Sequence, residues 1–264
     1  MKTPITYWGG KQQLVNNILP LIPLHRQYDE PFFGGGAIYF AKKPSEIEFI
    51  NDINGEMVNF YRTLKKNFSE LKEEVDCTLH SEFQHRQARY IYNEPLKYND
   101  VLRAWAVWML SKQSIYSILN NGWSVEIDKN KAKQVQWSKE TFTQLYARRL
   151  EHTSIFSRDA LNVIQSTDRP TTFHYVDPPY YNADMGHYKG YTEEDYKNLL
   201  ELLSGIKGKF LLSSYPSDIL NEYISQNGWH TKELHMHRSA GNGDKVEVFT
   251  MNYETNFSQQ VELF

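Results

Sequence analysis

The residues best suited to chemistry stand in the stretch Asp177-Pro178-Pro179-Tyr180. They follow an apolar-leaning run, 172–176, which is typical of a strand. Because proline lacks the N–H that a sheet ladder needs, we expect the strand to end with Asp177 at its carboxyl end. A carboxylate, a proline carbonyl and a flat ring at this place suit the binding of an amino group on a planar heterocycle. The alternative for this motif alone is an ordinary strand-to-loop turn with packed aromatic rings.

A glycine-rich turn near the N-terminus is the second feature that indicates a ligand. Residues 27–33 favour a strand that runs into Gly34-Gly35-Gly36, and residues 37–41 favour a helix. A tight strand-to-helix turn of glycines lets a ligand approach the backbone closely. The Gly-x-Gly-x-x-Gly spacing of dinucleotide-binding proteins is absent, so the ligand need not carry a pyrophosphate.

An acidic residue also ends the next predicted strand. Asp52 follows residues 46–51 and lies 18 positions beyond Gly34. An acid at this place in a nucleoside-binding βαβ unit accepts hydrogen bonds from ribose hydroxyls. The alternative role, which does not exclude the first, is an N-cap for a helix that begins near Gly55.

A third acid follows the same pattern. Residues 154–160 favour a strand, and Asp159 lies at its end. Together with Asp52 and Asp177, it outlines one site along the carboxyl edge of a sheet. A nucleoside-like cofactor without a pyrophosphate fits this outline, and S-adenosylmethionine is the natural candidate.

The composition limits the class of protein. The chain has 264 residues, a formal net charge of −3 and one cysteine, Cys77, which excludes an internal disulfide framework and suits a reducing cytosol. Cys77 lies among acidic residues that disfavour its thiolate, so we expect no cysteine nucleophile. No apolar run is long enough to span a bilayer, the start of the chain lacks a signal-peptide pattern, and no His/Cys cluster predicts a metal site.

The charge is unevenly distributed along the chain. Residues 84–149 hold 11 Lys and Arg against 5 Asp and Glu, although the whole chain is acidic. A basic segment in an acidic chain is typical of a module that faces DNA, and a solvated charged face is the equally plausible alternative. Since residues 55–149 are mostly helix-like and interrupt the α/β pattern, we interpret them as containing an inserted domain.

The α/β pattern resumes after this segment. Residues 209–215 favour a buried strand, and residues 229–238 and 246–253 alternate as the two strands of a hairpin. The predicted fold is therefore α/β, with a sheet interrupted by a mainly helical insert.

Four stretches of this sequence together carry a family resemblance. They are Tyr7-Trp8-Gly9-Gly10-Lys11, Glu30-Pro31-Phe32-Phe33-Gly34-Gly35-Gly36, Asn51-Asp52-Ile53-Asn54 and Asp177-Pro178-Pro179-Tyr180. In content and order they resemble the Dam-type DNA adenine-N6 methyltransferases. The resemblance covers residues 1–60 and 150–255 well.

The resemblance implies a Rossmann-like methyltransferase sheet with an inserted, mainly helical target-recognition domain. It implies a catalytic domain that binds S-adenosylmethionine at 1–58 and 150–264, and a DNA-binding domain at 59–149. The implied catalytic residues are Asp177, Pro178 and Tyr180. The implied cofactor-binding residues are Tyr7, Lys11, Phe33, Gly34, Gly36, Asp52, Asp159 and Asp177.

The implied partner is double-stranded DNA, methylated on a flipped adenine, with GATC as the candidate sequence. The residues that we expect to contact DNA are Lys112, Gln113, Asn120, Asn121, Lys129, Lys131 and Lys133. Asn120 stands where the family pattern has an Arg, which weakens the transfer of GATC to this chain. We further expect a monomeric, cytoplasmic protein of bacterial or phage origin that belongs to a restriction-modification system.

Two other functions remain open from the sequence. One is methylation of a different amino group, on cytosine or on RNA adenine, by the same scaffold. The other is a catalytically silent DNA-binding module. Loss of Asp177 or of the glycine turn would indicate the silent module, and both are present.

Overall fold

The computed structural model describes residues 1–126, 128, 130–181, 191–237 and 244–255. The chain divides into two compact units. The first comprises Met1–Val15, Gly34–Pro44 and Asp52–Ser157, and the second comprises Asn16–Phe33, Ser45–Asn51 and Arg158–Phe264.

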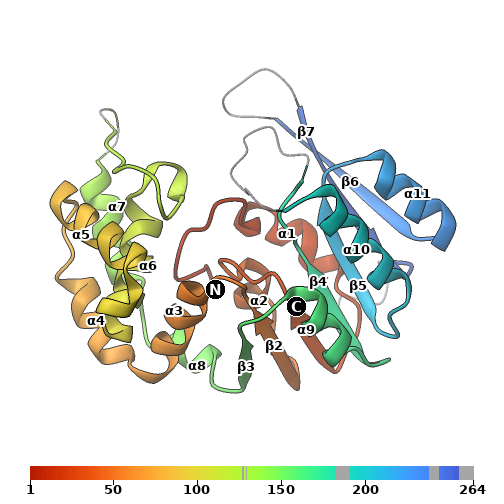
Figure 1. The fold of residues 1–264 in the computed structure, drawn as a ribbon, viewed down its shortest axis with the longest axis horizontal. Helices are drawn as coiled ribbons and strands as arrows, with labels where there is room; N and C mark the ends of the chain where they lie inside the picture. The colour runs from red at the N-terminus through yellow and green to blue at the C-terminus, as the bar shows by residue number, and fades with distance from the viewer. Residues whose placement is uncertain (127, 129, 182–190, 238–243, 256–264) are drawn as a thin grey trace. The chain divides into compact units, whose positions relative to one another are not determined.

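The second unit is built on a mixed sheet (Figure 1). Its strands are β1 (Gln27–Glu30), β2 (Ile47–Asn51), β4 (Thr172–Val176), β5 (Lys209–Ser214), β6 (His230–His237) and β7 (Asp244–Met251). They are hydrogen-bonded in the order β2-β1-β4-β5-β7-β6. The first four pair in parallel, whereas β7 pairs antiparallel with β5 and with β6. The predicted C-terminal hairpin is thus confirmed.

Burial explains why the parallel strands lie at the centre of the sheet. Every residue of β1 and β4 is buried, as expected for parallel strands that are covered on both faces. The helices of this unit are α1 (Val15–Ile18), α9 (Ala160–Thr167), α10 (Glu193–Ser204) and α11 (Asp218–Asn227), with a short 3-10 turn at Leu19–Leu21.

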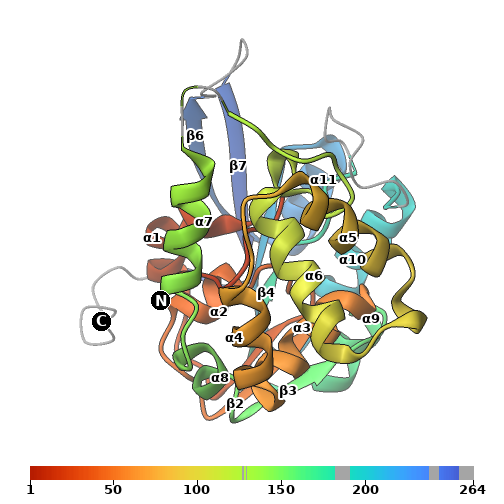
Figure 2. The same cartoon turned by 90° about the vertical axis from the view of Figure 1, so that its left-hand side faces the viewer.

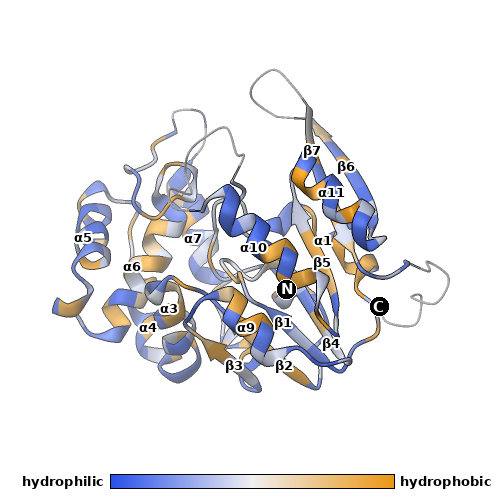
Figure 3. Ribbon diagram, turned by 45° about the vertical axis from the view of Figure 1, so that its right-hand side comes forward, coloured by the Kyte–Doolittle hydropathy of each residue, from blue (hydrophilic) through white to orange (hydrophobic). Residues whose placement is uncertain are grey.

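One hydrophobic core joins helices α9, α10 and α11 to the sheet. Leu199 and Leu203 of α10 and Leu220 of α11 pack with Phe210 and Leu212 of β5. Figure 3 shows the corresponding pattern, with apolar and polar residues mixed along α10 and α11. Helices with one apolar face against a mostly parallel sheet make a Rossmann-like α/β fold, so the predicted fold class is confirmed.

The first unit is mainly helical. It contains α2 (Ala37–Ala41), α3 (Gly55–Lys66), α4 (Phe68–Asp76), α5 (Glu82–Asn93), α6 (Asp100–Gln113), α7 (Lys131–Glu140) and α8 (Leu145–Arg149). It also contains the 3-10 turns Lys11–Gln13, Pro95–Lys97 and Ile115–Ser117 and the strand β3 (Thr153–Phe156).

Helix α6 is the centre of this unit. All of its residues from Ala104 to Ser111 are buried, and it packs against α3, α4 and α5 (Figure 2). A helix that is apolar on every side is expected to be surrounded by others. Asparagine or serine side chains cap the start of four of these helices, at Asn54, Ser81, Asn99 and Asn130.

The two compact units have different boundaries from the predicted domains. The predicted insert, 59–149, lies wholly within the first unit and is helical, as expected. That unit also takes in Met1–Val15 and the glycine turn, which we assigned to the catalytic domain. The units describe packing alone, and the division into catalytic and DNA-binding domains stays a prediction.

Candidate active site

The Asp-Pro-Pro-Tyr stretch lies directly after strand β4, which ends at Val176. Asp177 is half-buried and Pro178 is buried. The predicted end of the strand is therefore correct to the residue. Because β4 lies between β1 and β5, Asp177 follows a central strand of the sheet, at the carboxyl edge where open α/β sheets bind ligands.

The hydroxyl of Tyr180 lies in a polar cluster of the second unit. It is 3.3 Å from Asp177 Oδ1 and 3.1 Å from Ser213 Oγ, and it donates a short hydrogen bond to Glu247 Oε1. Ser213 Oγ donates to the same Glu247 oxygen at 2.6 Å. Burial raises the pKa of Tyr180 well above its usual value, and the charges of Asp177 and Glu247 add to the effect. Tyr180 is therefore a neutral donor.

The ring of Tyr180 has a close aromatic neighbour. It packs edge-on against Tyr215, with 4.4 Å between the ring centroids. A ring held by its hydroxyl at one end and by an aromatic contact at its side has little rotational freedom. That rigidity is what a stacking surface needs, and stacking itself stays a prediction.

Sequence reasoning missed Ser213 and Glu247. Both side chains are fully buried, and they come from neighbouring strands, β5 and β7. The available signal was an acid inside an apolar strand, between Val246 and Val248. A buried carboxylate needs donors, so such a residue indicates a polar partner elsewhere in the fold.

In the first unit, Asp52 is joined to the glycine turn. Its Oδ2 accepts the Gly34 N–H and its Oδ1 accepts the Asn54 N–H, both at 2.9 Å. Tyr61 OH donates to the Gly34 carbonyl at 2.8 Å. Burial raises the pKa of Asp52 to about 6. The alternative role as a helix cap is wrong, because Asn54 caps helix α3.

The backbone of the turn explains its glycines. Gly34 and Gly36 have φ angles of +48° and +67°, in the left-handed region that disfavours other residues. A Cβ on Gly34 would lie 3.0 Å from Tyr7 Cδ1. The structure thus brings Tyr7, the glycine turn and Asp52 together, and their role as a binding site stays a prediction.

Lys11 lies in the same unit and is 6% exposed. Its ammonium group donates to the Gly9 carbonyl at 3.1 Å. A buried lysine that bonds the backbone of its own glycine pair holds that segment in place.

The two other predicted cofactor residues belong to the second unit. Phe33 is buried, and its N–H donates to the Asn51 carbonyl at 2.9 Å. Asp159 caps helix α9 by accepting the Asn162 N–H at 3.1 Å. Asn51, which sequence reasoning missed, connects the segments that contain Phe33 and Asp159. Its amide nitrogen donates to the Pro31 and Arg158 carbonyls, and its amide oxygen accepts from the Arg158 N–H.

Among the predicted DNA-contacting residues, Gln113 requires a correction. Its side chain is 1% exposed. Its amide nitrogen donates to the Leu79 carbonyl at 2.8 Å, and its amide oxygen accepts from Ser81 N and Trp123 Nε1, each at 3.3 Å. A buried amide that is bonded at both its nitrogen and its oxygen inside the helical unit does not present itself to base edges, so we withdraw Gln113 from the DNA-contacting set.

Asn120 and Asn121 lie in the turn that follows Ile115–Ser117. Asn120 is exposed, and its Oδ1 accepts from Asn93 Nδ2 at 3.2 Å. Asn121 donates to the Ile115 carbonyl at 3.3 Å. Tyr116, which sequence reasoning did not single out, lies within the 3-10 turn Ile115–Ser117, is 65% exposed and has a φ of 56°.

Two of the four predicted DNA-contacting lysines are on helix α7. Lys131 forms an ion pair with Glu126 at 2.5 Å, and Lys133 is exposed. Lys129 lies outside the described residues. Lys112 lies in the last turn of α6, and its ammonium group donates to Thr6 Oγ1 at 3.3 Å.

Two classes of feature are absent from the part of the chain that the structure describes. No three His, Cys, Asp or Glu side chains are grouped so that they could hold a metal ion. No helix there is long and apolar enough to cross a membrane.

Comparison with known protein families gives one match that spans most of the chain. The model of the D12 class N6 adenine-specific DNA methyltransferases matches residues 7–237, which include Tyr7, Asp52 and the Asp177–Tyr180 stretch. The chain belongs to this family. The predicted resemblance to the Dam-type enzymes is thereby confirmed.

Individual relatives are more distant. The chain is 44% identical over 72 residues to the type II methyltransferase M1.LlaDCHI of Lactococcus lactis, which is 26% of this chain and 25% of that protein. It is 24% identical over 256 residues to the DNA N-6-adenine-methyltransferase of Escherichia phage P1, covering 88% of this chain and 32% of the relative. The type II methyltransferase M.MjaIII of Methanocaldococcus jannaschii is 24% identical and matches over 95% of this chain and 99% of its own length.

The match thus spans a third or less of the first two relatives, but nearly the whole of the third. Among solved structures, an rRNA methylase from Streptococcus thermophilus aligns with 90% of this D12-class chain. Its identity is 10% and its TM-score is 0.35, too low to support a conclusion.

Proposed function

We propose that this protein transfers a methyl group from S-adenosylmethionine to the exocyclic amino nitrogen of adenine in double-stranded DNA. The observation that carries the proposal is the Asp177-Pro178-Pro179-Tyr180 stretch at the carboxyl end of β4, in a chain of the D12 class. The stretch offers the acceptors that an aromatic amino group needs.

The chemistry explains why acceptors are required. The lone pair of the adenine amino nitrogen is delocalised into the ring, so this nitrogen is a poor nucleophile. The Asp177 carboxylate and the Pro178 carbonyl accept hydrogen bonds from the two N–H groups of this nitrogen. This favours a pyramidal nitrogen whose lone pair can attack a methyl group in line. Asp177 accepts the proton only as the new N–C bond forms, so it need not be a strong base beforehand.

A base inside a duplex cannot reach these groups, so the adenine must leave the stack. Tyr180 offers the extruded ring a face for stacking, and its fixed hydroxyl keeps that face in one orientation. Stacking on an aromatic side chain contributes about 1–3 kcal/mol per base in other proteins.

The first unit contains residues that fit the cofactor. The glycine turn allows close approach to its backbone, and the Asp52 carboxylate, which is half-buried and fixed by two N–H groups, fits ribose hydroxyls. Tyr7 packs on the turn, and Lys11 belongs to the same unit. Phe33 and Asp159, the other residues of the expected set, belong to the second unit. S-adenosylmethionine supplies the electrophilic methyl group when it is bound.

The helical segment is the proposed DNA-reading part. Lys131 and Lys133, with Lys129, would neutralise backbone phosphates, whereas Asn120 and Asn121 would contact base edges. GATC is the first sequence to test. We expect it to fail if the Asn at position 120 removes a contact that the family's Arg supplies.

The experiment is methylation of duplex DNA by the purified protein, followed by digestion to nucleosides and mass spectrometry. The proposal predicts N6-methyladenine in duplex DNA. Methylcytosine, or methylation of RNA alone, would favour another amino group as the substrate. No methylation of any nucleic acid by a protein that binds DNA would favour a silent module. Long-read sequencing of DNA from expressing cells would then give the recognition sequence.

A further inference from the structure

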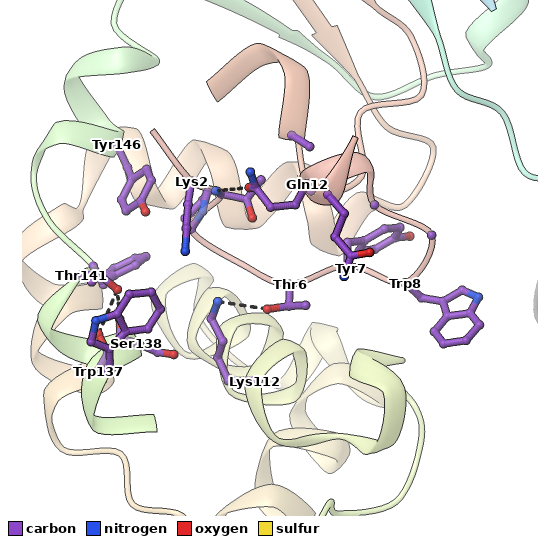
Figure 4. A pocket seen from close by; sticks show the side chains of 18 of the residues that line it. Lys2, Thr6, Tyr7, Trp8, Gln12, Lys112, Trp137, Ser138, Thr141 and Tyr146 are labelled. Carbon is purple, nitrogen blue, oxygen red and sulfur yellow. Dashed lines mark hydrogen bonds between the residues drawn. The ribbon is translucent and has the colours of Figure 1, made fainter. Parts of the chain in front are cut away.

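A pocket of about 720 Å³ lies within the first unit (Figure 4). One wall is the N-terminal segment, from Lys2 to Gln13, and another is the end of α6 at Lys112. The remaining wall comes from the end of α7, the turn that follows it and α8, with Trp137, Thr141 and Tyr146.

The charged side chains that line this pocket are both cationic. Lys2 and Lys112 line it, and none of the described residues of its lining is Asp or Glu. Burial lowers the pKa of Lys112 to about 8. Partial desolvation disfavours the charged form of this ammonium group, and an anionic ligand beside it would favour that form.

The groups that face Lys112 are neutral or cationic. The one hydrogen bond of its ammonium group among the described residues is to Thr6 Oγ1, at 3.3 Å. Lys2 is the other cation of the lining, and its ammonium group lies 5.2 Å from the centroid of the Trp137 ring. The remaining titratable groups of the lining are the tyrosines Tyr7, Tyr116 and Tyr146.

The Thr6 hydroxyl makes the site more specific. It accepts from Lys112, which leaves its own O–H to donate to a ligand oxygen. An ammonium group beside a hydroxyl donor suits the oxygens of a phosphate group better than a base edge, because a point charge does not select one acceptor pattern.

The cofactor is a poor fit to this pocket, although Tyr7 and Gly35 belong to both regions. S-adenosylmethionine carries a sulfonium and an ammonium group against one carboxylate, so its net charge is positive. Two lysines without an acid would repel it.

We propose that this pocket binds a backbone phosphate of the DNA substrate, with Lys112 and Thr6 as its direct ligands and Lys2 as a supporting charge. The inference rests on the proposed function for the identity of the partner. It assigns Lys112, which we expected from the sequence to contact DNA, to the DNA backbone rather than to a base edge.

The test is binding of a fluorescently labelled duplex, followed by anisotropy at pH 7 and pH 9. Phosphate binding requires the protonated Lys112, and the protonated fraction falls to about one in eleven at pH 9 if the pKa is about 8. The affinity of the wild-type protein should therefore fall by about tenfold between these pH values. Lys112→Arg should bind DNA with almost no such fall, because arginine stays charged.

The salt dependence separates a phosphate contact from a base contact. Lys112→Ala should lower the slope of log K against log salt by about 0.9 and weaken binding to all sequences alike. Lys66→Ala, at an exposed position of α3, is the matched control and should leave the slope unchanged. Calorimetry with S-adenosylmethionine should give the wild-type affinity for both alanine variants, which also shows that they are folded.

Three outcomes would overturn the inference: a wild-type slope in Lys112→Ala, a pH-dependent fall that persists in Lys112→Arg, or a change in recognition sequence without a change in slope. Methyl transfer by the wild-type protein is measured separately. If methylation fails but the pH and salt effects of Lys112 hold, the proposed reaction is wrong and the phosphate site stands.

Discussion

The hydroxyl of Tyr180 donates to the buried carboxylate of Glu247, across 67 positions of sequence. A hydroxyl carries one proton, and Asp177 Oδ1 is a more distant acceptor, at 3.3 Å. The proton of Tyr180 is therefore directed to Glu247 rather than to Asp177. Through this bond, Glu247 on strand β7 holds Tyr180, which belongs to the stretch that we propose to be catalytic.

The first prediction concerns this support. Glu247→Leu should lower the rate of methyl transfer by about ten- to a hundredfold, since a buried hydrogen bond to a charged group contributes about 1.5–3 kcal/mol. Glu247→Gln should recover part of the rate, because its amide oxygen can still accept from Tyr180. Single-turnover rates at saturating DNA and cofactor are the measurement.

A matched control is available on the surface of the same unit. Glu201 accepts from Tyr223 OH at 3.1 Å, so Glu201→Leu removes a similar tyrosine–carboxylate pair away from β4. Its rate should equal that of the wild type. Equal rates for Glu247→Leu and the control would show that Glu247 has only a packing role.

The second prediction concerns Asp52 and the cofactor. With a pKa of about 6 in the free protein, the carboxylate becomes protonated as the pH falls below 6. If it accepts the ribose hydroxyls as an anion, the affinity for S-adenosylmethionine should be full at pH 7.5 and about tenfold lower at pH 5. Asp52→Asn should show weaker binding without this pH dependence. Calorimetry at the two pH values decides, and a parallel pH dependence in both proteins would remove Asp52 from the site.

The third prediction concerns helix α7. Replacing Lys131 and Lys133 by Ala should reduce the salt slope of DNA binding by about 2, because each phosphate contact contributes about 0.9. The ion pair of Lys131 with Glu126 makes Lys133 the larger contributor, so the two single variants should differ. Filter binding from 50 to 200 mM salt measures the slopes. An unchanged slope in the double variant would place the DNA path elsewhere.

The fourth prediction concerns stability and a buried histidine. His174 Nδ1 lies 2.8 Å from Asp29 Oδ2, and its Nε2 lies 3.6 Å from Asp168 Oδ1. Burial works against the charged form, but the carboxylates of Asp168 and Asp29 outweigh it and raise the pKa of His174. Because the folded pKa exceeds the unfolded one, the stabilisation is complete below the unfolded pKa. It is lost as the pH rises through the folded pKa.

Urea unfolding at several pH values from 5.5 upward measures this effect. The wild type should lose stability as the pH rises, apart from any opposing contribution of other groups. His174→Gln should be destabilised by about 3–5 kcal/mol at pH 5.5, because the buried Asp29 carboxylate and the partly buried Asp168 carboxylate lose their cation. The difference between the two proteins should shrink at higher pH. A constant difference would mean that His174 is neutral throughout.

Local patterns explain what the sequence could predict. The strand before Asp177, the glycine turn at Gly34 and the strand before Asp52 each depend on residues within ten positions, and the structure confirms all three. The C-terminal hairpin is equally local, and the helical nature of the insert follows from its periodicity.

The parts that sequence reasoning missed depend on contacts between distant segments. Glu247 meets Tyr180 only because β7 inserts beside β5, a topology that no local pattern encodes. Gln113 was misassigned because a polar residue next to a lysine in the sequence is expected to be exposed. Its hydrogen-bond partners Leu79 and Ser81, which bury it, are more than thirty positions away. Asn51 likewise bonds Arg158, 107 positions further on.

The most direct test of the account is single-turnover methyl transfer by Asp177→Ala, with saturating DNA and S-adenosylmethionine. The wild-type protein should form N6-methyladenine, and the variant should be slower by about a hundredfold or more, because it lacks the acceptor that aligns the amino nitrogen. Asp218→Ala, at the exposed start of α11, is the control and should keep the wild-type rate. Unchanged binding of cofactor and DNA would show that Asp177→Ala is folded. A wild-type rate in that folded variant would contradict the role of Asp177 and the mechanism built on it.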